Sequence, residues 1–401
     1  MISPPSQIYP NVNVEILRNF GLQPISSRFI QSPSTTEFFQ EMRLALCPVS
    51  GLVQLAETFP PEELRPRVPW ITAFEPEAHL DDLTSRLASL PGLSVDSIVA
   101  GYSSKDDSTL QRLKERGFKN QWRLDPALDL SLSDSCAFVE SFQLPFCDGV
   151  ASLAAEKHGR PQLFLVRHVL EHSYDILRFL RAAAGVIRDD GYVMFEVPDC
   201  TRAFEALDYT TLWEEHSVYF TPWTFLQALT AAGLEPVIFE NYPHSFENCM
   251  VAVCRKTDLV KSLPQPQVPE AEVARAHRFA NEFPRVTKDL RGRLEKLKSQ
   301  GKRMALFGAG HLAVAFLSLH GLSDFFECVI DDNPHKDGML LPGSFLPIKS
   351  SSALLTDRIH VCMLSLNPES EDKVIQKNAK FTAAGGNFLS IFPSSSRYFA
   401  L

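Results

Sequence analysis

Residues 214–220 place the side chains best suited to acid–base chemistry within a few positions of one another. The segment reads EEHSVYF and contains Glu215, His216 and Tyr219. A histidine with an ordinary pKa of about 6.5 can accept a proton at physiological pH, and a tyrosine hydroxyl can donate to an oxyanion. The same sequence is also explained by a capped surface histidine beside aromatic residues of the core. The segment alone leaves both the catalytic and the structural interpretation open.

A second set of polar residues follows the apolar strands expected in the middle of the chain. Gly101 lies in AGYSSKDDSTL, after the first strand, and Asp125 ends the second. In open α/β sheets a carboxylate at this place accepts hydrogen bonds from the two hydroxyls of a ribose. A plain strand-to-helix turn and an Asp-Pro turn explain these residues equally well. Arg167 and His168 follow the next strand, at the edge where such sheets bind ligands.

A third set lies near the C-terminus, where the chain reads LFGAG and then VIDDNPHKDG. Gly308 and Gly310 precede a helix whose amino end could hold phosphate, and Asp331 and Asp332 close the next strand. A GxG turn with an acid about twenty residues later is a generic dinucleotide-like pattern. An oxidoreductase is one interpretation of it.

The alternation of apolar runs predicts a sheet that brings the strand ends of the middle region together. Strands are expected at 96–102, 121–127, 161–172 and 189–199, with an antiparallel hairpin at 234–243 and 248–256. This order predicts an α/β fold with a doubly wound sheet and a terminal antiparallel element. That is the arrangement of class I methyltransferases.

A second α/β unit is expected after the proline-rich stretch at 254–270, where three closely spaced prolines lack amide donors. Apolar residues at three- and four-residue spacing up to 301 predict one long helix or a broken pair, followed by a second parallel open sheet. We therefore expect three parts. They are a small N-terminal module at 1–72, a methyltransferase-type domain at 73–262 and a Rossmann-like α/β domain at 263–401.

Composition excludes several classes of partner. The chain has 401 residues, is 45% hydrophobic and carries a formal net charge of −9. It lacks the dense basic face that phosphate backbones require, so we expect no nucleic-acid partner. No apolar run has the length of a membrane span, and the first ten residues lack a signal-peptide pattern, so we expect no membrane partner and a cytoplasmic location. The oligomeric state is left open.

Three groups of segments resemble the three-domain sugar C-methyltransferases, and the resemblance spans nearly the whole chain. The segments are LFGAG, VIDDNPHKDGMLLPGSFLPI and GGNFLSIFP; RHVLEH, FEVPD and EEHSVYFT; and FGLQPISSRFI with CPVSGLVQL. The resemblance implies a zinc-ribbon-like N-terminal module, a central domain that binds S-adenosylmethionine, and a C-terminal nucleotide-fold domain. In this family the last domain forms a wall of the substrate cleft, which disfavours the oxidoreductase interpretation.

The resemblance also implies roles for individual residues. His216 would be the base that removes a proton next to a ketone, Glu215 would orient its ring, and Tyr219 would donate to the developing oxyanion. The residues implied to contact the cofactor are Gly101, Asp125, Arg167 and His168. Those implied to contact the substrate are His244, Asn248, Gly308, Gly310, His335 and Lys336. The implied reaction transfers a methyl group to C-3 of a nucleotide-linked 4-keto-deoxysugar.

The cysteines depart from the pattern of the family's zinc-ribbon module. Only Cys47 stands at a ligand position, Ser50 occupies the second, and the upstream pair is absent. A tetrahedral zinc site needs about four good ligands, so we expect no metal. The eight cysteines contain no CxxC pair, and we expect them to be buried reduced thiols.

Other departures lie at the expected site itself. Trp213 and Glu214 replace a Tyr-His pair, and Phe246 and Glu247 replace the glycines of a turn that contacts the substrate. The cofactor turn has Gly101 as its one glycine. These changes leave two alternatives open: a methyltransferase with another natural-product acceptor, and a family-shaped binding partner that has lost catalysis.

Overall fold

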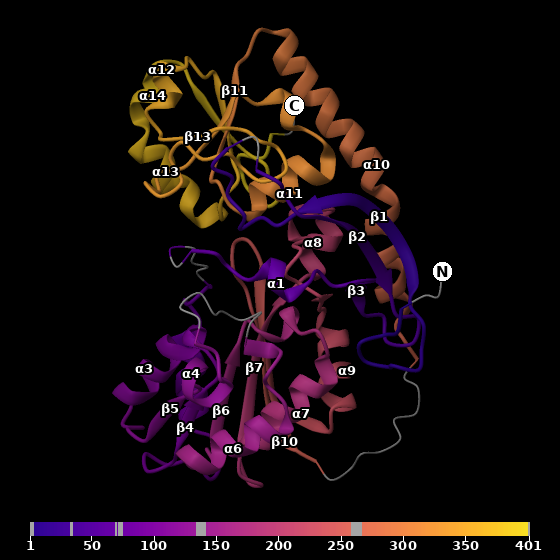
Figure 1. Cartoon of the computed structure of the whole chain (residues 1–401), viewed down its shortest axis with the longest axis vertical. Coiled ribbons are helices and arrows are strands. Elements are labelled where there is room, and N and C mark those ends of the chain that lie inside the picture. The colour runs from indigo at the N-terminus through magenta and orange to yellow at the C-terminus, as the bar shows by residue number, and fades with distance from the viewer. Residues whose placement is uncertain are drawn as a thin grey trace. The chain divides into compact units, whose positions relative to one another are not determined.

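The computed structural model describes residues 4–32, 35–68, 70, 75–133, 142–257 and 267–399. Contacts between residues divide the chain (Figure 1) into two compact units. Unit 1 comprises Met1–Glu15, Ala45–Thr201 and Glu215–Val273, and unit 2 comprises Ile16–Leu44, Arg202–Glu214 and Ala274–Leu401. The expected domain boundaries at 72/73 and 262/263 lie outside the described residues, so the three-domain division stays a prediction.

A six-stranded sheet with the order β5-β4-β6-β7-β10-β9 organises unit 1. The strands are β4 (Val99–Gly101), β5 (Gln121–Arg123), β6 (Leu163–Arg167), β7 (Tyr192–Asp199), β9 (Leu234–Tyr242) and β10 (Asn248–Lys256). The first four are parallel, and β10 runs antiparallel to both β7 and β9. The doubly wound order and the terminal antiparallel hairpin predicted from the sequence are confirmed.

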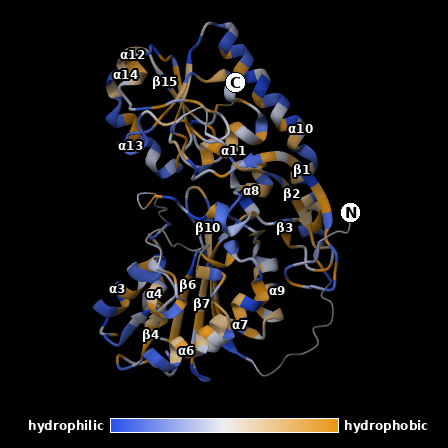
Figure 2. Cartoon of the chain, viewed as in Figure 1, coloured by the Kyte–Doolittle hydropathy of each residue, from blue (hydrophilic) through white to orange (hydrophobic). Residues whose placement is uncertain are grey.

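Helices cover both faces of this sheet (Figure 1). They are α2 (Leu80–Ala88), α3 (Asp107–Glu115), α6 (Asp148–His158), α7 (Ile176–Val186) and α9 (Pro222–Ala231). Successive residues of a strand point to opposite faces: Val193 packs with α6, α7 and α9, whereas Met194 packs with α2 and α3. Because both faces are covered, the central strands are apolar along their length (Figure 2).

Short elements continue the chain at the ends of the unit 1 strands. They are η1 (Ser104–Asp106) after β4, α4 (Pro126–Leu130) after β5, η2 (Leu170–His172) after β6, and α8 (Thr201–Ala206) after β7. A separate two-residue strand, β8 (Val218–Tyr219), pairs antiparallel with β3 (Val53–Leu55). This pairing fixes the backbone of the segment that contains His216.

Unit 2 contains a five-stranded sheet with the order β13-β12-β11-β14-β15, in which all neighbours are parallel. The strands are β11 (Met304–Phe307), β12 (Cys328–Ile330), β13 (Ile348–Lys349), β14 (Val361–Leu364) and β15 (Asn387–Ser390). The helices of this region are α10 (Glu270–Ser299), α11 (His311–His320), η4 (Ser323–Phe325), α12 (Ala353–Thr356), η5 (Pro368–Ser370), α13 (Glu371–Lys377) and α14 (Ala379–Ala383). The predicted second open sheet is confirmed, and the long helix α10 is continuous through Pro284.

The N-terminal residues form β1 (Glu15–Pro24), β2 (Phe39–Leu46), β3 and the short helix α1 (Pro61–Leu64), and η3 (Tyr209–Thr211) joins unit 2 from the middle of the chain. After β2, the Cys47 amide donates to the Leu52 carbonyl and the Gly51 amide donates to the Cys47 carbonyl. Cys47 and Ser50 are both buried in this turn. The likeness of this module to a zinc ribbon is not confirmed, and the expected absence of a metal there stays a prediction.

The cysteines are free thiols throughout the described part of the chain, as expected. Cys47, Cys200, Cys249, Cys254, Cys328 and Cys362 are buried, Cys147 is partly exposed, and Cys136 lies outside the described residues. Within the described ranges, no helix is both long and apolar enough to cross a membrane. The expected cytoplasmic location stays a prediction.

Candidate active site

The carboxyl ends of the central strands in unit 1 hold a cluster of buried and partly buried charged residues. We name it the ion cluster, and its members are Glu75, Lys105, Arg167, His168 and Glu196. Arg167 ends β6 and lies opposite Glu196 of β7 in the parallel register. Its Nε lies 2.7 Å from Glu196 Oε2 and its Nη2 lies 3.1 Å from Oε1, which is a two-pronged ion pair. Both side chains are buried, so this pair is part of the protein interior.

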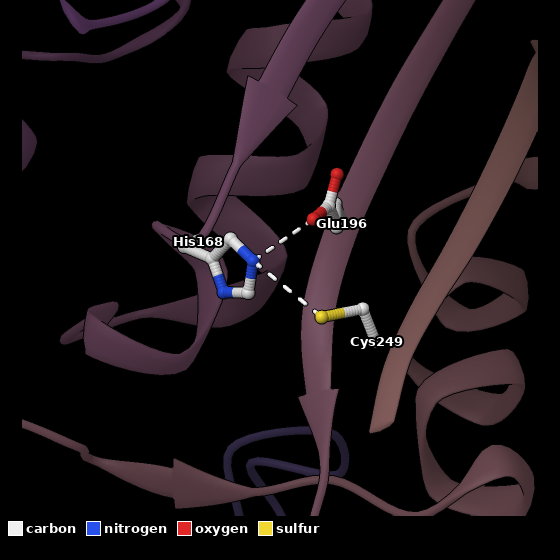
Figure 3. Close-up of side chains that lie close together, drawn as sticks. All are labelled: His168, Glu196 and Cys249. Atoms are coloured by element: carbon white, nitrogen blue, oxygen red, sulfur yellow. Dashed lines mark hydrogen bonds and ion pairs between the residues drawn. The ribbon is translucent and has the colours of Figure 1, made fainter. Parts of the chain in front are cut away.

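His168 is held beside this pair by a backbone conformation that residues other than glycine rarely adopt. Its φ is +48°. The His168 amide donates to the Glu196 carbonyl at 2.8 Å, and Nε2 lies 2.9 Å from Glu196 Oε1 and 3.9 Å from Cys249 Sγ (Figure 3). Nδ1 lies 3.5 Å from an oxygen of Glu75 and 3.5 Å from an oxygen of Glu171. Together these contacts hold His168 in its strained backbone conformation. They also orient its ring toward the surrounding carboxylates.

The pKa values show that partners outweigh burial in the ion cluster. Burial alone would raise the pKa of Glu75, but His168, Lys105 and Arg167 lower it to about 2. Burial also opposes charge on Glu196 and on His168, yet Arg167 and His168 hold the pKa of Glu196 well below its usual range. Glu75 and other partners hold the pKa of His168 well above its usual range. At neutral pH the cluster is therefore a set of ionised groups that stabilise one another's charges.

A carboxylate shapes the loop between β4 and α3, where the sequence predicts the cofactor turn. Asp106 Oδ2 accepts from the amides of Tyr102 and Ser103, both at 2.9 Å, and Oδ1 accepts from the Arg167 amide at 3.0 Å. A Cβ on Gly101 would lie 2.9 Å from the Cβ of Asp106, so the loop requires a glycine there. Burial raises the pKa of Asp106 to about 7 although these hydrogen bonds oppose the shift.

Asp125 stands at the same edge of the sheet, one strand away. Its Oδ1 accepts from the amides of Ala127 and Leu128 at 2.9 and 2.8 Å, so it caps α4. Both bonds use Oδ1, which leaves Oδ2 for the hydroxyl of a ligand. Gly101 of β4 lies in register with Arg123 of β5, so the two strand ends meet. A glycine at one strand end and a carboxylate at the next fit the ribose of a nucleoside.

The segment with His216 is tied to the residues that follow β6. The Ser217 amide donates to the Glu171 carbonyl at 2.8 Å, and the Ser217 hydroxyl donates to the carbonyls of Glu171 and Ser173. Glu215 and Tyr219 are buried, whereas His216 is partly exposed. The His216 ring lies edge-on to that of His172 at 4.7 Å between centroids, and 6.2 Å from that of Tyr219. The structure thus places the His216 ring near those of Tyr219 and His172, and Glu215 precedes His216 in the chain.

His244 joins the ion cluster from the loop between β9 and β10. Its Nε2 lies 3.1 Å from His79 Nδ1, and His79 Nε2 lies 3.3 Å from Glu196 Oε1. The His244 amide donates to Asn248 Oδ1 at 3.4 Å. Loss of solvent raises the pKa of the nearby Glu247 to about 8, against the opposing effect of His168. A chain of ionisable groups therefore leads from His244 to Glu171 and on to His216.

Sequence reasoning missed several residues of this site. They are Glu75, His79, Lys105, Asp106, Glu171, His172 and Glu196. Glu171, His172 and Glu196 lie in the segments RHVLEH and FEVPD. In both segments an acidic residue lies at or just beyond the end of a buried strand, and this pattern could have indicated a functional site. The structure also gives Arg167 and His168, predicted to touch the cofactor, a different environment: both side chains bond to protein groups.

The remaining predicted residues lie in unit 2. Gly308 has a φ of +107°, and a Cβ there would lie 2.9 Å from the Ser365 carbonyl oxygen. Gly310 caps α11. Lys336 Nζ donates to the Ala309 carbonyl at 2.7 Å and lies 2.9 Å from Asp331 Oδ2, while His335 is exposed. A lysine of the same chain thus neutralises the acid that would otherwise bind a ribose.

Comparison with known proteins assigns both α/β regions. A family model described as a methyltransferase domain matches residues 62–238, and one described as a C-methyltransferase C-terminal domain matches residues 268–393. The chain is an S-adenosylmethionine-dependent C-methyltransferase. It is also similar to the C-methyltransferase NovU of Streptomyces niveus, with 23% identity over 329 residues that cover 79% of this chain and 77% of NovU.

Solved structures similar to this C-methyltransferase match less than half of its chain. One is the 1,6-didemethyltoxoflavin-N1-methyltransferase of Burkholderia thailandensis, with a TM-score of 0.31 and 15% identity over 45% of this chain and 80% of that chain. Another is an S-adenosylmethionine-dependent methyltransferase of Clostridium acetobutylicum, with a TM-score of 0.31 and 9% identity over 44% of this chain and 91% of that chain. The sheet order of unit 1 and the two matched family models, and not these two structures, confirm the fold class, the enzyme class and the cofactor predicted from the sequence.

Proposed function

We propose that this C-methyltransferase methylates a carbon next to a ketone in a small molecule, C-3 of a nucleotide-linked 4-keto-deoxysugar, with His216 as the base. The observation that carries the proposal is the placement of His216. It is partly exposed between buried neighbours, and Ser217 fixes its backbone to Glu171. A base held in this way can meet a substrate without first being ordered.

His216 takes the proton from the carbon next to the ketone, and the electron pair of that C–H bond moves into the enolate. Glu215, which precedes it in the chain, orients the ring, and Tyr219 donates to the enolate oxygen. When bound, S-adenosylmethionine would supply a methyl group on a positively charged sulfur, and S-adenosylhomocysteine would be the leaving group. The carbon thus exchanges a hydrogen for a methyl group, and His216 carries the proton away.

Asp125 and Gly101 are the residues that we propose to hold the cofactor, with Asp125 Oδ2 accepting from a ribose hydroxyl. Arg167 and His168 support this site indirectly, because their contacts fix the strand end and the loop beside it. His244 and Asn248 contact the acceptor. Substrate roles for Gly308, Gly310, His335 and Lys336, and the three-domain division, rest on the resemblance of the sequence to the sugar C-methyltransferases.

A different small-molecule acceptor is the second candidate function, and Glu247 favours it. This residue replaces a glycine of the family pattern and lies near His168, Glu171, Glu75 and Asp199. An added carboxyl group at this place changes the shape of the surroundings of His244 and adds a hydrogen-bonding group, which its raised pKa of about 8 keeps mostly protonated at neutral pH. An acceptor that carries a basic or hydroxyl group would suit Glu247 better than an apolar deoxy position.

The test is exchange of the acceptor's α-proton with deuterated water, measured by mass spectrometry with S-adenosylhomocysteine in place of the methyl donor. We expect wild-type enzyme to exchange the proton of a nucleotide-linked 4-keto-deoxysugar and His216→Asn to lose about 10²- to 10⁴-fold in rate, the usual contribution of a general base. His360→Asn, at an exposed position of unit 2, is the matched control. Equal rates in wild type and His216→Asn would refute the assignment of the base.

A further inference from the structure

A second cluster of possible ligands lies at the end of β6, outside the ion cluster. We name it the His-His-Glu cluster, and it consists of Glu171, His172 and His216. One ligand atom of each residue lies within 4.8 Å of those of the other two. Glu171 and His172 are neighbours on η2, and the hydrogen bonds of Ser217 to the Glu171 carbonyl hold His216 against them. The backbone therefore places the three side chains before any ligand arrives.

Glu171 has an unsatisfied oxygen, which points to a missing ligand. The residue is 2% exposed, and its Oε1 lies 3.5 Å from His168 Nδ1. Its Oε2 is buried and accepts no hydrogen bond from the residues that the structure describes. A buried acceptor without a partner costs roughly 1–3 kcal/mol, and more when it is charged. A bound cation would remove that cost.

The neighbouring group of His168, Glu196 and Cys249 (Figure 3) is a weaker candidate for an ion. Both oxygens of Glu196 already accept from Arg167. A divalent cation there would lie beside the guanidinium and be repelled by it. Burial also raises the pKa of the Cys249 thiol to about 11, which opposes formation of the thiolate that binds metals.

We infer that the His-His-Glu cluster binds a divalent transition-metal ion such as Zn²⁺, and that this ion inhibits the enzyme. Two imidazoles and a carboxylate are ligands that Zn²⁺ and Co²⁺ accept, with bonds of about 2.0–2.2 Å. Such bonds place tetrahedral ligands roughly 3.4 Å apart, so the partly exposed His216 must rotate toward Glu171 and His172. No electron is transferred, and any imidazolium proton leaves to water.

Inhibition follows because the ion occupies the lone pair with which His216 takes the substrate proton. This consequence rests on the proposed function, whereas binding of the ion does not. The ion is an inhibitor and not a resident part of the enzyme, so the expectation of no structural metal in the N-terminal module is unchanged.

The experiment is a titration of the purified full-length chain with Co²⁺, followed by visible absorption and then by displacement with Zn²⁺. We expect one ion per chain and a Kd raised about tenfold or more in Glu171→Gln and in His172→Asn. Cys249→Ala, which alters the neighbouring group, should bind with the wild-type Kd. An absorption band from cobalt bound to thiolate, or loss of binding in Cys249→Ala, would overturn the assignment.

A second measurement needs no variant and covers the case in which a substitution misfolds. Zn²⁺ should protect the partly exposed His216 of the wild-type chain from diethyl pyrocarbonate, while the exposed His335 stays reactive, as mapped by mass spectrometry. Equal reactivity of His216 with and without Zn²⁺ would overturn the site.

Deuterium exchange separates this proposal from the proposed function. Zn²⁺ should slow exchange by wild-type enzyme at the concentrations that fill the cobalt site, and a chelator should restore the rate. Wild-type exchange by His216→Asn would refute the base and leave the ion site standing. Absence of cobalt binding together with loss of exchange in His216→Asn would refute the ion site alone.

Discussion

Arg167 and His168 show how a polar side chain at a strand end can serve the protein interior. Open α/β sheets bind ligands at this edge, which is why both residues were expected to touch the cofactor. The structure instead surrounds them with Glu75, Glu171 and Glu196. The side chains keep their charges because their partners are equally buried, so their contribution to the site is to hold its geometry.

Replacing Glu196 by Gln should destabilise unit 1 by about 3–5 kcal/mol, because Arg167 and His168 would then be buried without their shared counter-ion. Urea unfolding followed by circular dichroism measures this change. The control is Glu240→Gln, which removes the partner of Arg86 in an ion pair at the surface. We expect little change there because solvent screens exposed pairs. A similar small effect at Glu196 would show that the ion cluster relaxes or takes up water.

Gly101→Ala should destabilise the protein by about 1–3 kcal/mol, the usual cost of forcing an extra carbon into a filled interior. The new Cβ would lie 2.9 Å from Asp106 and 3.1 Å from a methyl carbon of Leu110. Gly149→Ala is the matched control, because nothing lies within 4 Å of its Cβ position on α6. Equal midpoints of urea unfolding for the two variants would contradict the close approach.

The proposed catalytic residues are close in the sequence, whereas the residues that surround them in the structure are not. His216, Glu215 and Tyr219 lie within five positions. His172 and Glu171 meet them only through the hydrogen bonds of Ser217 across some 45 residues of sequence. Such long-range contacts depend on the packing of the whole unit, and no local pattern encodes them.

At the scale of elements, the loop after β4 depends on one carboxyl group. Asp106 accepts three backbone hydrogen bonds. These bonds fix the conformation of the loop, which in a glycine-rich ligand-binding turn is set by the glycines. Its pKa is raised to about 7 in the folded protein, whereas an unfolded aspartate has a pKa near 3.9. Between these values the folded state binds the extra proton, so this group stabilises the fold at low pH and loses that effect as pH rises toward 7.

Asp106→Asn should therefore change how stability depends on pH. Wild type is expected to lose stability relative to Asp106→Asn as pH rises from about 5 to 8, because only wild type has a buried carboxyl group that must ionise. Melting temperatures measured at several pH values give the comparison. Parallel curves for the two proteins would show that Asp106 is ionised, and satisfied by its hydrogen bonds, over the whole range.

Most strands of both sheets could be predicted because each is an apolar run with both faces covered. β6 and β7 are buried at every position, and the apolar runs in their sequences are enough to predict both strands. The pairing of β3 with β8 joins Val53 to Tyr219 and could not be predicted. Strands of two or three residues are too short to show a period, and their partners are set by contacts distant in sequence.

At the scale of the molecule, unit 2 is assembled from three separate stretches of chain. An aromatic cluster joins them: Phe20, Tyr209, Phe279 and Phe283 have ring centroids 4.4–6.2 Å apart. The Tyr209 hydroxyl donates to the Phe279 carbonyl at 2.7 Å. These contacts therefore join stretches of chain that are not consecutive in the sequence.

A fragment of residues 267–401 should therefore fold poorly on its own, although it contains the whole five-stranded sheet. It lacks Phe20 and Tyr209, which bury one face of α10. Thermal unfolding followed by near-ultraviolet circular dichroism is the measurement, with full-length Tyr209→Phe as the control that loses one hydrogen bond, worth about 1 kcal/mol. A fragment that melts cooperatively at the temperature of the full-length protein would contradict this expectation.

Because unit 2 consists of three separate stretches of chain, it can complete its folding only late in synthesis. The ribosome releases Ile16–Leu44 first and Ala274–Leu401 last. Until the last stretch emerges, Phe20 of β1 lacks its ring contact with Phe283 of α10, and a pair of strands without further packing is barely stable in water. The nascent chain therefore carries β1 and β2 without their final packing through most of its translation, which makes this N-terminal stretch a natural target for the chaperones that meet growing polypeptides.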